Sequence, residues 1–233
     1  ELVHERFSRV GQLLEQRQLG EQVDGILMDL GVSSPQLDEA ARGFSFRASG
    51  PLDMRMDPTT GPTASEWLAD ASEKELRECL WELGEERYAR NIARKIAQVR
   101  SHDPIATTLQ LATVIREAVP RGNSRIDPAT RTFQAIRLKI NSELEELSEG
   151  LRHATDNLNV GGRVVVLAFH SLEDRIVKRF FRDLCRSEDP YLSKSEGPRF
   201  QLQTKKPIRP GDAERKRNPR ARSARLRALE RIA

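Results

Sequence analysis

The fold is decided by the stretch at residues 161–170, "GGRVVVLAFH". Two glycines suit a turn, and the valine-rich apolar run after them ends at His170. The run has no alternation of polar and apolar residues, so it predicts a strand buried on both faces, as in a parallel sheet. An earlier strand-length run, within "GILMDLGVSSPQLD" at 25–38, ends at Asp29 and passes into a small polar turn. Two such strands among helices predict an α/β fold.

Most of the remaining chain has the apolar spacing of amphipathic helices, with apolar residues three or four positions apart. This spacing predicts helices over 6–17, 74–100 with a break at Gly84, 107–119, 128–151 as one long helix, and 171–186. Hydroxyl and acidic residues at capping-box spacing stand at three helix starts: "TASE" (63–66), "SEKE" (72–75), and Ser171 with Asp174.

The order of these elements predicts how the chain divides into domains. Residues 1–62, which include a long polar loop, and residues 128–186 form a sheet domain. Residues 63–127 form an all-α insert, whose end could extend to about residue 155. Residues 187–233 form a basic C-terminal tail.

Composition narrows the class of protein. The chain has 233 residues, of which 37% are hydrophobic and 32% charged, and its longest apolar run is too short to span a bilayer. We therefore expect no membrane association, and the absence of a secretory signal favours the cytoplasm. Cys79 and Cys185 form no CxxC motif, and the four histidines are scattered, so the sequence predicts no disulfide framework and no metal site.

Charge is distributed unevenly along the chain. Residues 199–233 carry a net charge of +9, whereas the rest carries −5. A block of this kind is either a solvated tail or an arm that binds phosphates. For the second alternative the candidate residues are four arginines: Arg220, Arg222, Arg225 and Arg227. Part of the segment "NPRARSA" (218–224) is also expected to dock on the sheet domain.

The ends of the two strands are the candidate site. In an open parallel sheet, ligands bind beyond the carboxyl ends of the strands. Asp29 ends one strand, and His170 with Ser171 ends the other. Two structural alternatives stay open, because Asp29 could cap a nearby turn and His170 could be a satisfied structural histidine. The sequence has no GxxxxGK[ST], GxSxG, HExxH or GxG motif, which excludes several enzyme classes.

Five long segments, in order from near residue 1 to the end, closely resemble the bacterial small-subunit ribosomal RNA cytosine-N4-methyltransferase family. They are "DGILMDLGVSSPQLDEAARGFSFRASGPLDMRMD", "GEERYARNIARKI", "PATRTFQAIRLKINSELEEL", "FHSLEDRIVKRFF" and "NPRARSARLRALER". The resemblance implies a class I methyltransferase fold, with a Rossmann-like sheet and an inserted helical domain. It implies methylation of N4 of a cytidine in the decoding region of 16S rRNA, with S-adenosylmethionine (SAM) as cofactor and the small ribosomal subunit as partner.

The resemblance also implies roles for individual residues. Phe7, Asp29 and Gln36 are expected to contact SAM. Asp29, Ser33 and Ser34 are the candidates to accept the hydrogens of N4. The candidates for RNA contacts are His170, Ser171, Arg131, Arg137, Asn141 and the arginines at 220, 222 and 225. Phe44 and Phe46 could either stack on the target base or anchor their loop.

The chain departs from the family pattern at one point. Members of the family begin with a strand and a "GGHS"-type glycine loop, followed by a strand that ends in an acidic residue, and neither is found here. We therefore expect the first strands of the sheet to be missing from this chain and the chain to be inactive alone. The alternative function is a non-catalytic RNA-binding or ribosome-assembly module that keeps the fold. The oligomeric state stays open, with a dimer as one option.

Overall fold

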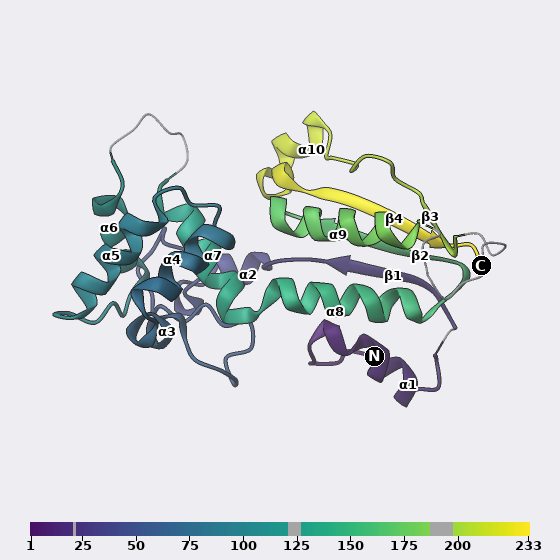
Figure 1. The fold of residues 1–233 in the computed structure, drawn as a ribbon, viewed down its shortest axis with the longest axis horizontal. Helices are drawn as coiled ribbons and strands as arrows, with labels where there is room; N and C mark the ends of the chain where they lie inside the picture. The colour runs from purple at the N-terminus through teal and green to yellow at the C-terminus, as the bar shows by residue number, and fades with distance from the viewer. Residues whose placement is uncertain (21, 121–126, 187–197) are drawn as a thin grey trace. The chain divides into compact units, whose positions relative to one another are not determined.

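The computed structural model describes residues 1–20, 22–120, 127–186 and 198–233 (Figure 1). The chain divides into two compact units, which are described separately below. The first combines Glu1–Gly31 with Leu144–Ala233, and the second runs from Val32 to Glu143. Both predicted boundaries of the helical insert, 63 and 127, fall inside the second unit.

The first unit is built on a four-stranded sheet with the order β1-β2-β4-β3. The strands are β1 (Val23–Asp29), β2 (Leu158–Ala168), β3 (Phe200–Leu202) and β4 (Arg225–Arg231). β1 and β2 are parallel, whereas β4 is antiparallel to both β2 and β3. The predicted α/β fold is confirmed, and the sheet is mixed rather than wholly parallel.

Burial along β2 corrects one sequence prediction. Val164, Val166 and Ala168 are buried, but Val165 and Leu167 on the opposite face are only half-buried. The strand is therefore not fully buried on both faces. On β1, Met28 is buried while the side chain of Leu27 is 67% exposed. Apolar composition could not distinguish a strand covered on one face from a strand covered on both.

Helices complete the first unit. They are η1 (Phe7–Arg9), α1 (Val10–Gln16), α8 (Glu143–Asp156), α9 (Ser171–Leu184), α10 (Asp212–Arg217) and η3 (Pro219–Ser223). The core is one apolar cluster to which both α8 and α9 contribute. Its members include Met28, Leu147, Leu151, Val164, Val166, Val177, Phe181 and Leu229.

The basic C-terminal segment is folded from residue 200 onward. It supplies β3, α10, η3 and β4, and β4 lies against β2 in the middle of the sheet. The prediction of a tail over 187–233 is therefore wrong for 200–231, while the prediction that part of it docks on the sheet is confirmed. Residues 187–197 of the predicted tail lie outside the described residues.

The second unit consists of helices around their own core. They are α2 (Ser34–Asp38), η2 (Ala40–Arg42), α3 (Ala64–Asp70), α4 (Glu73–Glu82), α5 (Ala89–Arg100), α6 (Thr108–Ala118) and α7 (Ala129–Asn141). The capping boxes predicted at Thr63–Glu66 and Ser72–Glu75 are both present. Phe44 is buried, and Phe46 packs edge-on against Phe133 with ring centroids 4.8 Å apart. Both aromatic rings are therefore loop anchors.

The predicted long helix is broken. α7 ends at Asn141, and Ser142 has a left-handed φ of 50° before α8 begins. The side-chain amide of Asn141 donates to the carbonyls of Met54 and Arg137, and its oxygen accepts from the N–H of Met56. These bonds tie the end of α7 to the loop and fix the break, which apolar spacing alone could not predict.

Candidate functional site

Strand register brings the two predicted strand ends to one edge of the sheet. Asp29 is opposite Leu167, and Ala168 is opposite Arg225 at the start of β4. Because η3 leads almost directly into Arg225, its residues stand at the same edge. Ligands bind beyond the carboxyl ends of parallel strands, so this edge is the candidate site.

Asp29 is the free carboxylate of this edge. Asp29 is exposed, and its side chain makes no hydrogen bond or ion pair with any residue that the structure describes. Asp24, near the other end of β1, instead accepts a bond of 2.9 Å from the amide of Asn159. The structural alternative, in which Asp29 caps a turn, therefore has no support among the described residues. A solvent-facing carboxylate at a strand end can accept hydrogen bonds from a ligand.

His170 is the N-cap of α9. Its Nδ1 accepts a bond of 3.4 Å from the backbone N–H of Glu173, and the buried Glu173 carboxylate accepts from the N–H groups of Phe169 and His170. His170 Nε2 lies 3.1 Å from Glu173 Oε1 without making a hydrogen bond. The predicted capping pair of Ser171 with Asp174 is therefore wrong. The cap is made by His170 and Glu173, which favours the structural alternative for His170.

Gly150 of α8 leaves room for the ring of Phe7 to pack against that helix. The Phe7 side chain is 42% exposed, and a Cβ at Gly150 would stand 2.7 Å from its ring and 3.0 Å from Met28 Cε. Only glycine therefore lets the ring approach α8 this closely. A nearby carboxylate, Glu146, receives a bond of 2.8 Å from Arg6. Phe7 offers a fixed, half-exposed aromatic face.

The family resemblance implies that Phe7 contacts SAM. On that basis we predict that Gly150→Ala lowers the affinity for SAM by about tenfold, or ~1.4 kcal/mol, because the new methyl displaces the Phe7 ring. The stability should change little, since alanine gains up to about 1 kcal/mol of helix propensity over glycine and offsets the lost packing. Calorimetric titration with SAM checks the affinity. In a Phe7→Ala background the same substitution should have almost no further effect. An equal loss in both backgrounds would mean that Gly150 does not act through Phe7.

Ser33, Ser34 and Gln36 belong to the second unit. Ser33 is the N-cap of α2, and Gln36 Oε1 accepts a bond of 2.8 Å from the Ser33 backbone N–H. Ser34 is exposed at the first position of the helix. Phe7 and Asp29 lie in the first unit. A single SAM site formed by Phe7, Asp29 and Gln36 therefore stays a prediction.

All three RNA-contact candidates in the second unit have partners within it. Arg137 and Glu143 form a largely buried ion pair of 2.7 Å, and Asn141 makes the backbone bonds described above. Arg131 is exposed and donates a bond of 3.2 Å to the carbonyl of Glu85. Of the three, Arg131 is the one that presents its charge to solvent.

The arginines of the basic segment also differ in whether they are buried in ion pairs or exposed to solvent. Arg227 is buried and donates to Asp174 at 2.7 Å, and Arg225 donates to the same carboxylate at 3.1 Å. Their charges are thus already compensated inside the unit. Arg222 is exposed and lines a surface hollow of about 520 Å³ together with Asp212, Arg215, Lys216 and Pro219.

Asp174 has a structural role beside the candidate edge that the sequence interpretation missed. Burial raises its pKa, but the hydrogen bonds and charges of Arg227 and Arg225 outweigh this, so the pKa lies below its ordinary value. The carboxylate joins α9 to β4 next to the candidate edge. Its partners are about fifty residues away in sequence, so no local pattern could have found them.

Two classes of site find no support in the described ranges. None of the described helices has the length and apolarity needed to cross a bilayer. No cluster of histidine, cysteine and acidic side chains suited to a metal ion occurs among the residues that the structure describes.

A mixed sheet with the exposed carboxylate of Asp29 at the end of β1 and the exposed Arg222 of η3 near the same edge defines an α/β protein with a candidate ligand site there. The model of the MraW methylase family matches residues 1–232. The chain is 53% identical to "Ribosomal RNA small subunit methyltransferase H" of Methylococcus capsulatus, over 99% of this chain and 77% of the relative. It is 51% identical to the protein of that name from Nitrosospira multiformis, over 99% of this chain and 76% of the relative. The chain therefore belongs to the MraW methylase family, a family of methyltransferases.

Proposed function

We propose that this protein uses SAM to methylate N4 of a cytidine in the decoding region of 16S rRNA. One observation carries the proposal: the exposed carboxylate of Asp29 lies at the edge where β2 ends and where the basic η3 segment leads into β4. The printed name of the relatives, which refers to small-subunit ribosomal RNA, supports RNA as the substrate. The small ribosomal subunit in the cytoplasm is then the partner.

Three side chains have chemistry that suits contacts with SAM. The half-exposed ring of Phe7 can stack on an adenine, and the carboxylate of Asp29 is free to accept hydrogens from the cofactor. Gln36 keeps its side-chain amide group near the start of α2, where it is half-buried. When bound, SAM supplies a methyl group activated by a sulfonium.

The protein's own residues then have two tasks. They must hold N4 about 3–3.5 Å from the methyl carbon and in line with the breaking bond. They must also accept the N4 hydrogens, because the amino lone pair is delocalised into the cytosine ring until those hydrogens are bound. Asp29, Ser33 and Ser34 are the proposed acceptors, and the released proton passes to one of them or to water.

RNA contacts make up the third part of the proposal. The target base must leave its stack, which costs a few kcal/mol unless the RNA is already open there. His170 and Ser171 shape the rim of the edge through the backbone at the end of β2, while Arg131, Arg220 and Arg222 hold phosphates. Arg137, Asn141 and Arg225 support these surfaces through the bonds described above.

Methyl transfer from labelled SAM to purified ribosomal subunits tests the proposal. The assay uses the chain extended at its N-terminus by the glycine-loop segment of the family, because the chain alone is expected to be inactive. We expect label in the RNA of small subunits prepared from cells that lack this modification, and none in large subunits. SAM binding measured in parallel separates an enzyme from the alternative, a non-catalytic RNA-binding module. RNA binding without SAM binding or methyl transfer would favour that module and contradict the proposal.

A further inference from the structure

Phe7, the proposed aromatic contact for SAM, lies in a segment that buries little of its own surface. Ser8 and Gly11 are the two buried residues in the range 1–20, which the structure describes in full. η1 is a single short turn, and Arg6 at its N-cap makes no side-chain capping bond. Short helical turns are marginal in isolation, and segments with few buried contacts open most readily. The position of Phe7 is therefore set by the element against which this turn packs.

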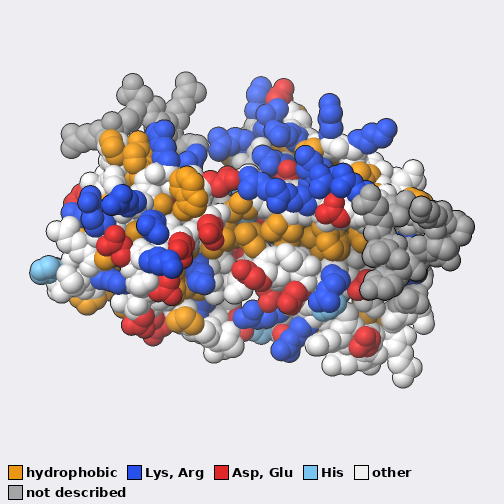
Figure 2. Space-filling model, in the orientation of Figure 1, with side chains coloured by type: hydrophobic (Ala, Val, Ile, Leu, Met, Phe, Trp, Pro, Cys, Tyr) orange, Lys and Arg blue, Asp and Glu red, His pale blue; other side chains and the backbone are white. Residues whose placement is uncertain are grey.

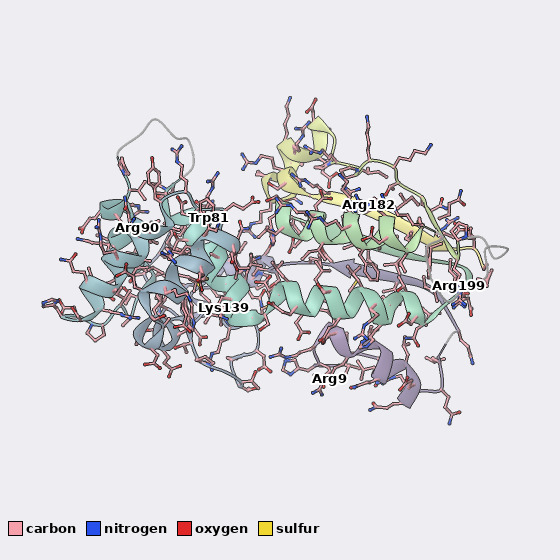
Figure 3. All side chains as sticks on the ribbon, in the orientation of Figure 1. Arg9, Trp81, Arg90, Lys139, Arg182 and Arg199 are labelled. Atoms are coloured by element: carbon pink, nitrogen blue, oxygen red, sulfur yellow. The ribbon has the colours of Figure 1, made fainter. Side chains whose placement is uncertain are left out.

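That element is α8, through one of its faces. Glu146, Gly150 and His153 follow one another at spacings of four and three residues, so they lie along one side of the helix. In Figure 3, Arg9 marks the end of η1, which lies alongside α8. Figure 2 shows acidic and basic side chains together over α8 and this N-terminal turn, as expected of an attachment through charged groups. The other side of α8 contributes to the apolar core of the unit.

Glu146 binds the start of the turn. Its carboxylate accepts a bond of 2.8 Å from Arg6, and its side chain is only 13% exposed. Burial raises the pKa of this carboxyl, but hydrogen bonds from Ser8 and Arg6 outweigh that effect, so the pKa lies below its ordinary value. A carboxylate is well suited to satisfying the free N–H groups at the start of a helical turn. Glu146 thus takes the capping role that the N-cap side chain of η1 does not fill.

His153 binds the same turn two helical turns further along α8. Its Nδ1 is in hydrogen-bonding contact with the carbonyl oxygen of Ser8, and because a carbonyl oxygen only accepts, Nδ1 carries the hydrogen. A Cβ at Gly11 would stand 3.3 Å from the Cβ of His153, so the start of α1 packs directly on this side chain. Gly150, between Glu146 and His153, leaves room for the Phe7 ring.

We propose that Glu146 and His153 are positioning residues for SAM, because they hold Phe7 where its ring can lie against the cofactor. The inference rests on the proposed function, which places Phe7 at SAM, and adds the residues that fix this placement. Only the docked turn presents the ring, so the apparent dissociation constant for SAM equals the intrinsic constant divided by the docked fraction. Saturating SAM restores the docked state, so the chemical step itself should hardly depend on either residue.

The test compares two variants that each remove one carboxylate from α8, made in the chain extended by the glycine-loop segment of the family. Glu146→Gln alters the group that holds the turn, whereas Glu149→Gln alters an exposed group of the same helix. Calorimetric titration gives the SAM affinity, and methyl transfer to small subunits gives KM for SAM and kcat. We expect Glu146→Gln to bind SAM roughly five- to tenfold more weakly, which corresponds to a docked fraction of about 0.1–0.2. Its KM for SAM should rise by the same factor while kcat stays nearly unchanged, and Glu149→Gln should match the unsubstituted protein.

Two further measurements separate positioning from a general loss of stability. Hydrogen exchange of the amides of residues 7–16 should be faster in Glu146→Gln and should be slowed again by saturating SAM, while exchange in β2 and the thermal midpoint stay unchanged. A purely structural role would instead speed exchange throughout the unit. His153→Leu, which removes the bond to Ser8 from a half-buried position, is the second variant and should show the same pattern.

In a Phe7→Ala background, Glu146→Gln should have almost no further effect on SAM affinity. A loss of the same size in that background, or equal SAM affinities for Glu146→Gln and Glu149→Gln, would overturn the positioning role and leave the proposed function standing. Failure of the unsubstituted, extended protein to bind SAM would overturn the proposed function and the positioning role with it.

Discussion

Asp29→Asn should lower the rate of methyl transfer by on the order of 100-fold or more. The substitution keeps the shape of the side chain but removes the charge that we propose accepts the hydrogens of N4. Loss of a positioned general base typically costs about 10²–10⁴ in rate. Displacement of the reacting groups by only about 1 Å can cost on the order of 100-fold by itself. Single-turnover transfer to small subunits measures the chemical step, and SAM titration shows how much of the loss lies in cofactor binding.

The matched control is Asp24→Asn on the same strand. Asp24 is also exposed, but it lies at the other end of β1 and bonds to Asn159 rather than facing the candidate edge. We expect this variant to retain nearly full activity. Similar losses for both variants would show that charge on β1 acts through the stability of the strand, and Asp29 would then not be at the site.

Asp174→Asn should lower the free energy of unfolding by roughly 3 kcal/mol, because it leaves the buried guanidinium of Arg227 without its counter-charge. With about 2–4 °C per kcal/mol for a chain of this size, the thermal midpoint should fall by about 6–12 °C. Asp183→Asn on the same helix is the control. Its ion pair with Arg182 is solvent-exposed, so its loss should cost less than about 1 kcal/mol.

The effect of Asp174 should depend on pH in a defined direction. Because its pKa is lower in the folded state than the ordinary value of about 3.9, the pair stabilises the fold above that pH. This contribution is lost as the pH falls through the folded-state pKa. Denaturant unfolding at pH 7 and pH 3.5 should therefore show a smaller difference between the unsubstituted protein and Asp174→Asn at the lower pH. A difference that grows on acidification would contradict the assigned ion pair.

Local patterns in the sequence predicted the elements that depend on local physics. The apolar runs that end at Asp29 and His170 are strands, and the capping boxes at Thr63 and Ser72 begin helices, because these signals involve residues a few positions apart. The carboxylate of Asp29 could also be singled out from local sequence, as a candidate site residue. A charged side chain at the end of an apolar strand is unusual and needs an explanation.

The remaining features depend on partners distant in sequence. "RLRALER" at 225–231 has a high density of charge and suggested either a solvated tail or a phosphate-binding arm. It is β4 instead, because Asp174 neutralises Arg227 and lets that arginine be buried. The break at Ser142 depends on a loop more than eighty residues earlier, which the Asn141 side chain holds.

The account is tested most directly by identifying the methylated nucleoside. Small subunits that lack the modification are incubated with the purified protein and methyl-labelled SAM, and the RNA is digested and analysed by mass spectrometry. The account predicts label in N4-methylcytidine from a decoding-region fragment, with a rate that falls on the order of 100-fold in Asp29→Asn. Label in a different nucleoside, or equal labelling by Asp29→Asn, would contradict it.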